Sequence, residues 1–324
     1  MKACRFRSVV LLLTAVLLLT TCACAAPAAP QRPPLKVAYV LWPGYYPLLI
    51  AQEKGFFAEE GVEVEVILAT ASAQARADMC AGVLDGLTYT LAGIVGAAGE
   101  CDARVIFATD ESSGADAVVA SAAIQSVQDL RRQRVGVGFG GYGEIILNAM
   151  LESAGMTSDD VVVVDVTGEA VPQAIQDGTI AAGVTWEPYV SQTVNAGGNI
   201  IFSTEQTPGL IPDVMAFHAS TLRDRPDDVR AFVRAWFRAV DYWLANREEG
   251  YALLTEILQT SPEAVSLEGM RLLSLEDNRR MYTVGTTSES LYYTTQLYVD
   301  FYTASGAIGT SVDIDALLEP SFLE

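Results

Sequence analysis

Short runs of apolar or alternating residues, separated by turns and by segments of helical periodicity, fill the chain from residue 35 onward. The clearest unit is Leu35 to Leu68, with an apolar strand at 37–41, an aromatic turn, a helix at 48–54, a glycine and an alternating strand at 62–66. Strand, helix and strand in this order form a right-handed βαβ unit. Small ligands bind at the carboxyl ends of the strands in such units, so the aromatic turn is predicted to border a ligand site.

The middle of the chain continues this alternation. Up to residue 120 we expect a helix at 71–84, a turn at 85–89, a helix at 92–98, a strand at 104–108 and an extended crossing at 118–120. A second group of elements follows, with strands predicted at 134–137, 161–166, 181–185 and 200–202 and helices at 144–154 and 170–177.

The last third of the chain is mainly helical in pattern. Residues 213–218 form an apolar strand that is expected to return to the first group, and helices are predicted at 229–246, 250–260, 262–275 and 289–305. A chain of this length suits two lobes better than one core. We expect lobe 1 at 35–118 and 214–324 and lobe 2 at 119–213, joined by two crossings that act as a hinge.

The first residues are typical of an export signal. In residues 1–21, basic residues precede an apolar run at 9–19, which is shorter than the about 20 residues that span a membrane. Cys22 after this run suggests lipoprotein processing; Cys24 is the alternative, and ordinary cleavage near 23–26 is a third possibility. Residues 22–34, rich in Ala and Pro, are then a tether. The expected location is the extracytoplasmic face of the cell membrane, lipid-anchored, or its periplasmic side where an outer membrane exists.

The composition is strongly acidic, with a formal net charge of −20. Removal of residues 1–21 takes away Lys2, Arg5 and Arg7 and no acidic residue, so the charge falls to −23. Nucleic acid and anionic membrane surfaces are repelled by such a protein. An anionic ligand receives no long-range attraction either, although a local site can override the global field.

Several segments carry specific sequence motifs. Trp42-x-Gly44-Tyr45-x-Pro47 precedes Ala-x-Glu-Lys-Gly-Phe-Phe at 51–57, and further matches occur at 110–116, 126–130 and 186–188. They resemble the extracytoplasmic solute-binding proteins of ABC importers, in the branch that binds nitrate, alkanesulfonates, taurine, thiamine-pyrimidine precursors and, in some lipoproteins, riboflavin. The resemblance implies an α/β fold of the two-lobed periplasmic-binding-protein type II, a clamshell with a C-terminal helical segment. It also implies an ABC permease and its ATPase subunit as partners.

A glycine loop at 138–143 matches G-x-G-x-x-G after a strand, with Asp165 at the end of the next strand. By pattern alone this is a dinucleotide fingerprint, and a dinucleotide-dependent enzyme is the remote alternative. The export signal and the family resemblance argue against it. In a binding protein, Gly140 and Gly141 let the backbone approach a ligand, and Tyr142 and Glu144 supply side chains, or these two lie in an exposed first helical turn.

Aromatic residues provide the other ligand candidates. Trp42, Tyr45 and Tyr46 could stack on a flat ring, and at least one of the three is expected to pack on the core instead. Tyr89 is a fourth candidate. Trp186 and Glu187 follow a strand of lobe 2 and are expected to face the first group across the cleft.

The remaining polar residues admit two roles. Asp110 and Ser112 line the floor of the cleft or, with Asp116, stabilise the hinge turn. His218, the single histidine, lies on an apolar strand and is expected to be structural. Cys80 and Cys101 form a disulfide in an oxidising compartment or remain as two buried thiols.

Catalysis finds little support, because G-x-S-x-G and paired histidines are absent from the sequence and a single histidine cannot build a zinc cluster with dispersed cysteines. The family also contains a pyrimidine-making enzyme with a Cys-rich motif, which this sequence lacks. We therefore expect a monomeric binding protein without cofactor or metal. The predicted cleft loops carry aromatic residues and carboxylates and no Arg or Lys, which suits an uncharged aromatic heterocycle, with riboflavin preferred over a thiamine-pyrimidine precursor or a sulfonate or nitrate.

Overall fold

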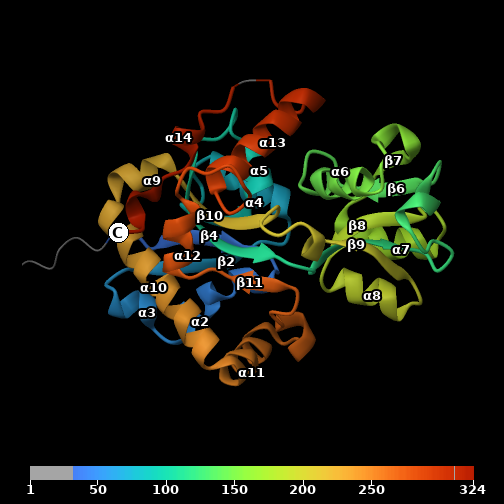
Figure 1. The fold of residues 1–324 in the computed structure, drawn as a ribbon. Helices are drawn as coiled ribbons and strands as arrows, with labels where there is room; N and C mark the ends of the chain where they lie inside the picture. The colour runs from blue at the N-terminus through green and yellow to red at the C-terminus, as the bar shows by residue number, and fades with distance from the viewer. Residues whose placement is uncertain (1–31, 310) are drawn as a thin grey trace, which may run out of the picture. The chain divides into compact units, whose positions relative to one another are not determined.

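The structure, a computed structural model, describes residues 32–309 and 311–324. The predicted signal at 1–21, most of the tether, and Cys22 and Cys24 lie outside the described residues. From Leu35 to Glu324 the strands divide between a six-stranded and a five-stranded sheet, each flanked by helices (Figure 1). The prediction of an α/β fold is confirmed.

The first sheet has the strand order β11-β4-β10-β3-β1-β2. Its central strands are β1 (Leu35–Tyr39), β3 (Gly86–Thr90), β10 (Pro212–His218) and β4 (Ala103–Ser112), with β2 (Val64–Leu68) and β11 (Met270–Leu272) at the edges. Strand β1 pairs in parallel with β2 and β3, as the predicted βαβ unit requires, whereas β10 runs antiparallel to β3 and β4. The return of β10 ties the second half of the chain to the first.

Helices from both ends of the chain pack around this sheet. The first part of the chain contributes η1 (Pro43–Tyr45), α2 (Pro47–Glu53), α3 (Phe56–Glu59), α4 (Ser72–Cys80) and α5 (Leu91–Gly96). From its last part come α9 (Ala219–Asp224), α10 (Pro226–Ala245), α11 (Arg247–Leu258), η6 (Pro262–Val265), α12 (Leu275–Met281), α13 (Leu291–Ser305), α14 (Ile314–Leu317) and η7 (Pro320–Phe322).

Helix α10 is the main element of this core. Pro226 and two aspartates occupy its first turn, which suits a helix start because proline lacks the N–H that would be unpaired and acidic groups favour the positive end of the helix dipole. Its apolar face is fully buried, and the rings of Trp236 and Phe237 lie 5.1 and 5.2 Å from that of Phe107 on β4.

The second sheet has the order β7-β6-β8-β5-β9. Its strands are β5 (Asp116–Ala120), β6 (Arg134–Val137), β7 (Val162–Asp165), β8 (Ala182–Trp186) and β9 (Asn199–Ser203). Side chains of β5 alternate between two cores, because Val118 and Ala120 pack with α6 (Gly143–Ser153) while Ala117 and Val119 pack with α7 (Val171–Gln176) and α8 (Tyr189–Asn195). The sheet is therefore covered on both faces.

The chain crosses between the sheets at 113–115 and 204–211. Short hydrogen bonds tie these crossings together: the hydroxyls of Ser112 and Thr204 lie 2.8 Å apart, and the N–H of Gly114 donates to Thr204 Oγ1 at 2.8 Å. Residues 119 and 213, where we divided the lobes, lie inside β5 and β10. The division into lobes remains a prediction.

Three local predictions were wrong. Of residues 85–89, predicted as a turn, residues 86–89 belong to strand β3, whose five residues are too few to show a period. Residues 118–120 belong to a strand of the second sheet rather than to an extended crossing. The helix predicted at 262–275 is replaced by η6, a loop and β11, because Met270 to Leu272 gain a strand partner in β4.

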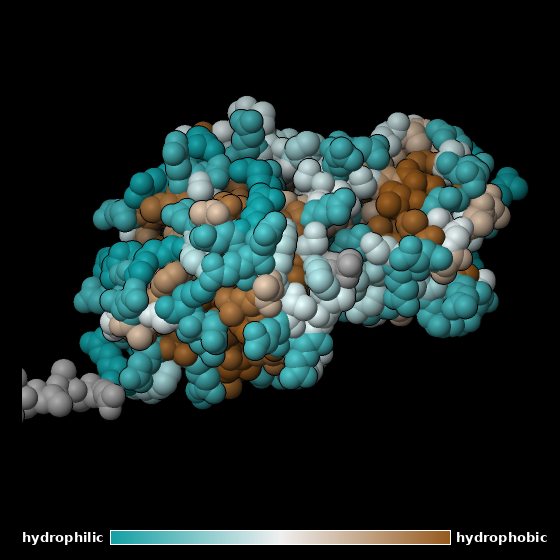
Figure 2. All heavy atoms as spheres, turned by 90° about the horizontal axis from the view of Figure 1, so that it is seen from below, coloured by the Kyte–Doolittle hydropathy of each residue, from teal (hydrophilic) through white to brown (hydrophobic). Residues whose placement is uncertain are grey.

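The surface is mostly hydrophilic, with hydrophobic side chains visible in separate areas in Figure 2. This distribution fits the excess of acidic residues. Within residues 32–309 and 311–324, no helix combines the length and apolar character that crossing a membrane requires.

Candidate functional site

The aromatic turn after β1 lies against two buried carboxylates. Trp42 is 6% exposed, and its Nε1 donates a hydrogen bond to Asp110 Oδ1 at 3.0 Å. The backbone of Gly44 approaches the same carboxylate so closely that a Cβ there would lie 1.9 Å from Asp110 Oδ2. Tyr45, at the end of η1, lies close to Asp213, and burial, Asp213 and Asp110 together raise the pKa of its hydroxyl well above the usual range. Glycine at position 44 is thus required for the close approach of the turn to Asp110.

Three aspartates, Asp110, Asp116 and Asp213, form what we call the acidic cluster. Their exposed fractions are 0%, 3% and 5%. Asp213 stands directly opposite Asp110 in the register of β10 and β4, an arrangement that destabilises a sheet when both groups are charged. Thr109 Oγ1 donates to Asp110 Oδ2 at 2.8 Å and the Tyr142 hydroxyl donates to Asp116 Oδ1 at 2.7 Å.

The acidic cluster is electrostatically strained. Burial raises the pKa of the Asp110 carboxyl to about 7 and that of Asp116 to about 6, although their hydrogen bonds act in the opposite direction. Burial, together with Asp110 and Asp116, raises the pKa of Asp213 well above its usual range. Among the described residues, no Lys, Arg or His forms an ion pair with any of the three.

The second sheet contributes aromatic residues next to this cluster. Tyr142 precedes α6 and Trp186 ends β8, and their ring centres lie 6.3 Å apart. Both pack against the core of the first sheet. Gly168 leaves room for the Trp186 ring, since a Cβ at 168 would lie 2.0 Å from it, and Tyr189 meets the ring edge-on at 5.8 Å. Side chains associated with both sheets therefore meet at the crossings.

The glycine loop is closed by carboxylates rather than open to an anion. Glu144 Oε2 accepts the N–H of Gly140 at 2.8 Å, and Asp165 Oδ1 accepts the N–H of Phe139 at 3.2 Å. Gly140 has a φ of +72°, which favours glycine. Gly140 is exposed and Gly141 is half-buried. Negative side chains thus occupy the N–H groups that a pyrophosphate would use in a dinucleotide site.

Most of the predicted ligand aromatics of the first sheet lie in packed surroundings. Trp42, Tyr45 and Tyr46 are 6%, 3% and 3% exposed and all pack in its core, where at least one was expected to do so, and Tyr46 meets Tyr39 edge-on at 6.4 Å. Tyr89 is half-buried, and its ring covers Gly93, where a Cβ would be 2.1 Å away. Neither Tyr46 nor Tyr89 contacts the acidic cluster through a hydrogen bond in the described part of the chain.

Glu187 and Ser112 form structural hydrogen bonds. Glu187 accepts the backbone N–H of Ser191 at 3.1 Å and its hydroxyl at 2.9 Å, which stabilises the start of α8. Ser112 Oγ accepts the N–H of Asp116 at 3.1 Å and, with Thr204, holds the crossings together. These contacts support the hinge alternative for Ser112.

Sequence reasoning missed Asp213 and Tyr298 as site residues. Asp213 lies at the start of the apolar strand β10, and a lone carboxylate in such a strand was the available signal. Tyr298 of α13 is fully buried and its hydroxyl donates to the carbonyl of Leu210. Burial first, then Tyr302, Asp213 and Asp116, raise its pKa. No local pattern places α13 beside the crossings, so its contribution required the tertiary structure.

The described residues contain no group of three or more His, Cys, Asp or Glu side chains placed to hold a metal ion. His218 is structural: its Nδ1 lies 2.7 Å from Ser220 Oγ, and it accepts the Ser220 N–H at the start of α9. A surface pocket of about 550 Å³ beside Tyr251 and Pro262 is lined by none of the residues of the acidic cluster.

Comparison with known proteins assigns the family. The model of the NMT1-like family matches residues 28–258. The chain belongs to the NMT1-like family. The match includes every predicted ligand residue and the acidic cluster, whereas Tyr298 lies beyond it.

Full-length relatives of this NMT1-like chain are named as binding proteins. The "Putative aliphatic sulfonates-binding protein" of Bacillus subtilis is 22% identical over 98% of this chain and 96% of its own length. The "Riboflavin-binding protein RibY" of Chloroflexus aurantiacus is 25% identical over 95% of each chain. The crystal structure of the periplasmic aliphatic sulphonate binding protein SsuA from Escherichia coli has a TM-score of 0.73 at 15% identity, covering 90% of this chain and 94% of that one. The last likeness confirms the periplasmic-binding-protein fold.

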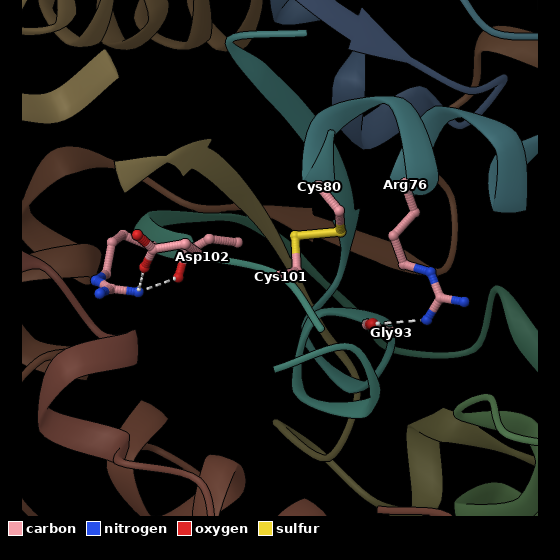
Figure 3. The surroundings of a disulfide bond; sticks show 7 residues. Arg76, Cys80, Gly93, Cys101 and Asp102 are labelled. Atoms are coloured by element: carbon pink, nitrogen blue, oxygen red, sulfur yellow. Dashed lines mark hydrogen bonds and ion pairs between the residues drawn. A yellow bond between two sulfur atoms is a disulfide. The ribbon is translucent and has the colours of Figure 1, made fainter. Parts of the chain in front are cut away.

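In this NMT1-like chain Cys80 and Cys101 form a disulfide, one of the two states that the sequence left open (Figure 3). Their Cα atoms are 4.6 Å apart, and the bond joins the end of α4 to the segment before β4. One turn earlier in α4, Arg76 donates to the carbonyl of Gly93. The disulfide and this hydrogen bond both connect α4 to the chain around α5.

Proposed function

We propose that this NMT1-like protein is the solute-binding component of an ABC importer and delivers a small organic molecule to a membrane permease and its ATPase subunit. The observation that carries the proposal is the convergence of Trp42, Tyr45, Tyr142 and Trp186 around the acidic cluster, at the crossings between two sheets. Polar groups that are buried and strained in this way are typical of functional sites. The names of the full-length relatives support the same class of protein.

In this proposal lobe 1 (35–118 and 214–324) closes on lobe 2 (119–213) around the ligand. Closure excludes water and brings side chains of both lobes onto the solute. The hydrogen bonds of Thr204 to Ser112 and Gly114 keep the two crossings in register, so the lobes rotate about a defined axis. The protein acts as a monomer, lipid-anchored through Cys22 or Cys24 on the extracytoplasmic face of the membrane.

The ligand we infer is an aromatic heterocycle, with riboflavin as the first candidate. The indole of Trp186 and the phenol ring of Tyr142, both half-buried, offer flat apolar faces for stacking. Buried carboxyls accept hydrogen bonds from imide or hydroxyl groups. A sulfonate or nitrate is a weaker candidate, because its negative charge would face the acidic cluster without an Arg or Lys beside it among the described residues.

An enzymatic role finds no support in the site. The glycine loop places the carboxylates of Glu144 and Asp165 on the N–H groups that a dinucleotide phosphate needs. His218 is engaged at the start of α9 and lies on the strand end remote from Asp213. A solute-binding protein shows saturable stabilisation by its ligand without turnover.

Fluorescence titration tests the proposal directly. Riboflavin stacked on an aromatic ring is expected to lose its fluorescence in proportion to bound protein, and Trp186→Ala should weaken binding. Tyr293→Ala, which removes an exposed aromatic ring, is the matched control and should bind as the parent does. Thermal stabilisation by taurine without any response to riboflavin would move the ligand to the sulfonate class. The solute-binding function would be refuted if no small molecule stabilised the protein and if its small-angle scattering curve, which reports closure of the lobes, stayed the same with every ligand.

A further inference from the structure

The oxygen of Asp213 that lacks a partner is the starting point. Asp213 Oδ1 is buried and forms no hydrogen bond within residues 32–309 and 311–324, although the residue as a whole is 5% exposed. Both oxygens of Asp110 are already engaged, by Trp42 and by Thr109, and Asp116 is engaged by Tyr142. A buried acceptor without a partner is costly. Asp213 Oδ1 is the one fully buried carboxylate oxygen of the acidic cluster that has no hydrogen bond in the described part of the chain.

The surroundings of Asp213 define what would satisfy it. Asp110 faces it across the sheet, and burial, Asp110 and Asp116 raise its pKa, so each carboxyl of the cluster disfavours the ionised form of the others. No basic side chain forms an ion pair with these groups in the described part of the chain. A bound group with positive charge would neutralise the cluster and would form a charge-assisted hydrogen bond with Asp213 Oδ1. The net charge of −20 also attracts cations at long range.

We propose that the ligand carries a protonated nitrogen, an ammonium or amidinium group on an apolar or aromatic body, and that Asp213 is its primary anchor. The inference rests on the proposed solute-binding function but not on riboflavin as the ligand, which a cationic solute would replace as the first candidate. A metal ion does not fit, because the described carboxylates are not grouped for chelation. An organic cation does, because aromatic faces attract cations and cover its apolar body. Among the described residues, the half-buried rings of Tyr142 and Trp186 next to the acidic cluster supply such faces.

Riboflavin carries no positive charge and becomes the comparison ligand for this inference. A neutral heterocycle can accept or donate at Asp213, but it leaves the mutual repulsion of the carboxylates in place. A cation removes that repulsion. Its affinity should therefore exceed that of a neutral molecule of the same shape, and should depend on the ionisation of the acidic cluster.

The test uses two matched pairs of probes on the purified protein. Benzamidine is compared with benzamide, and phenethylamine with phenethyl alcohol, because each pair differs mainly in charge. Thermal stabilisation is expected from the cation of each pair and not from its neutral partner. Asp213→Asn should lower the affinity for each cation by about tenfold or more, since it removes a charged acceptor. Asp300→Asn, an exposed carboxylate on α13, should leave binding unchanged.

The pH profile supplies a second readout. Both cations stay protonated between pH 5 and pH 8, so any gain in affinity over this range reports ionisation of the protein. The groups that face Asp213 or its neighbours, and so contribute to the profile, are Tyr45 on η1, Asp110 and Glu111 on β4, Asp116 on β5, Tyr142 before α6 and Tyr298 on α13. Cation affinity should rise with pH, because protons compete for the same carboxylates.

Each outcome decides a different question. Equal stabilisation by neutral and cationic partners, or binding of riboflavin or taurine without any response to the cations, overturns the inference and leaves the solute-binding function intact. Unchanged cation binding in Asp213→Asn also overturns it. If the variant unfolds, the pH profile of the parent decides, and a flat profile for benzamidine counts against the proposal. No response to cations, riboflavin or taurine would refute the inference and the proposed function together.

Discussion

The disulfide between Cys80 and Cys101 should contribute substantially to stability, and its effect can be estimated from the loop it closes. The two cysteines are separated by 21 positions in the sequence. In the chain-entropy model a loop of this length lowers the entropy of the unfolded chain enough to stabilise the folded state by about 3 kcal/mol. The bond also fixes α4 to the segment before β4, at the edge of a core that Cys101 itself helps to form.

The perturbation is the double variant Cys80→Ala with Cys101→Ala, compared with the oxidised parent by urea unfolding. Trp236 and Trp243 are fully buried in α10 of the same core, so their fluorescence reports unfolding of the part that contains the disulfide. We expect the unfolding free energy to fall by about 3 kcal/mol and the denaturant slope to rise, because an unlinked unfolded chain exposes more surface. Parent protein treated with reductant should resemble the variant.

Two results would refute this reasoning. If intact-mass measurement found free thiols on Cys80 and Cys101 in the exported protein, the disulfide would not exist there. A variant whose unfolding free energy stays within about 0.5 kcal/mol of the oxidised parent would show that the unfolded chain is constrained by other means. The matched control is the single variant Cys80→Ala, which should lose as much stability as the double variant, since either change removes the bond.

Further predictions concern the acidic cluster and the anchor. Without ligand, Asp116→Asn should gain stability relative to the parent as pH rises from 5 to 8. The pKa of Asp116 is raised to about 6 in the folded protein, so the folded parent must give up a proton that the unfolded chain has already lost, and the parent is destabilised over this range. A difference in melting temperature that does not change with pH would contradict this. Gly44→Ala should cost about 1 to 3 kcal/mol by chemical unfolding, because its Cβ would lie 1.9 Å from Asp110 Oδ2; a neutral effect would show that this carboxylate moves freely. Cys22→Ala should abolish lipid labelling and release the protein from membranes, and labelling that is lost only in Cys24→Ala would move the anchor there.

The local pattern of apolar and polar residues was sufficient to predict an element where buried positions repeat with the period of a helix or a strand. The unit from β1 to β2 follows the sequence because apolar positions and a glycine stop mark each end. Helix α10 begins a few residues earlier than predicted, at Pro226, but its apolar stripe was evident over several turns. The aromatic turn beside the strand ends was also visible, because aromatic and proline residues interrupt the strand pattern there.

The tertiary structure alone decided elements that depend on distant partners. Strand β3 is too short to show a period and is defined by pairing with β1 and β10. Strand β11 exists because β4 offers it an edge, where the sequence by itself favoured a helix. Pairing energy between strands comes from residues far apart in the chain, which a local pattern does not contain.

The candidate site shows the same division. The sequence supplied its chemical types, aromatic rings and carboxylates without basic partners, and these types excluded metal chelation by histidines and favoured an aromatic ligand over an anion. It could not show that Glu144 and Glu187 cap local structure, or that Asp213 stands opposite Asp110. Hydrogen-bond partners and the register of β10 and β4 are set by how the whole chain packs. The sequence therefore determined which groups were available, and only the folded chain decided which of them face one another.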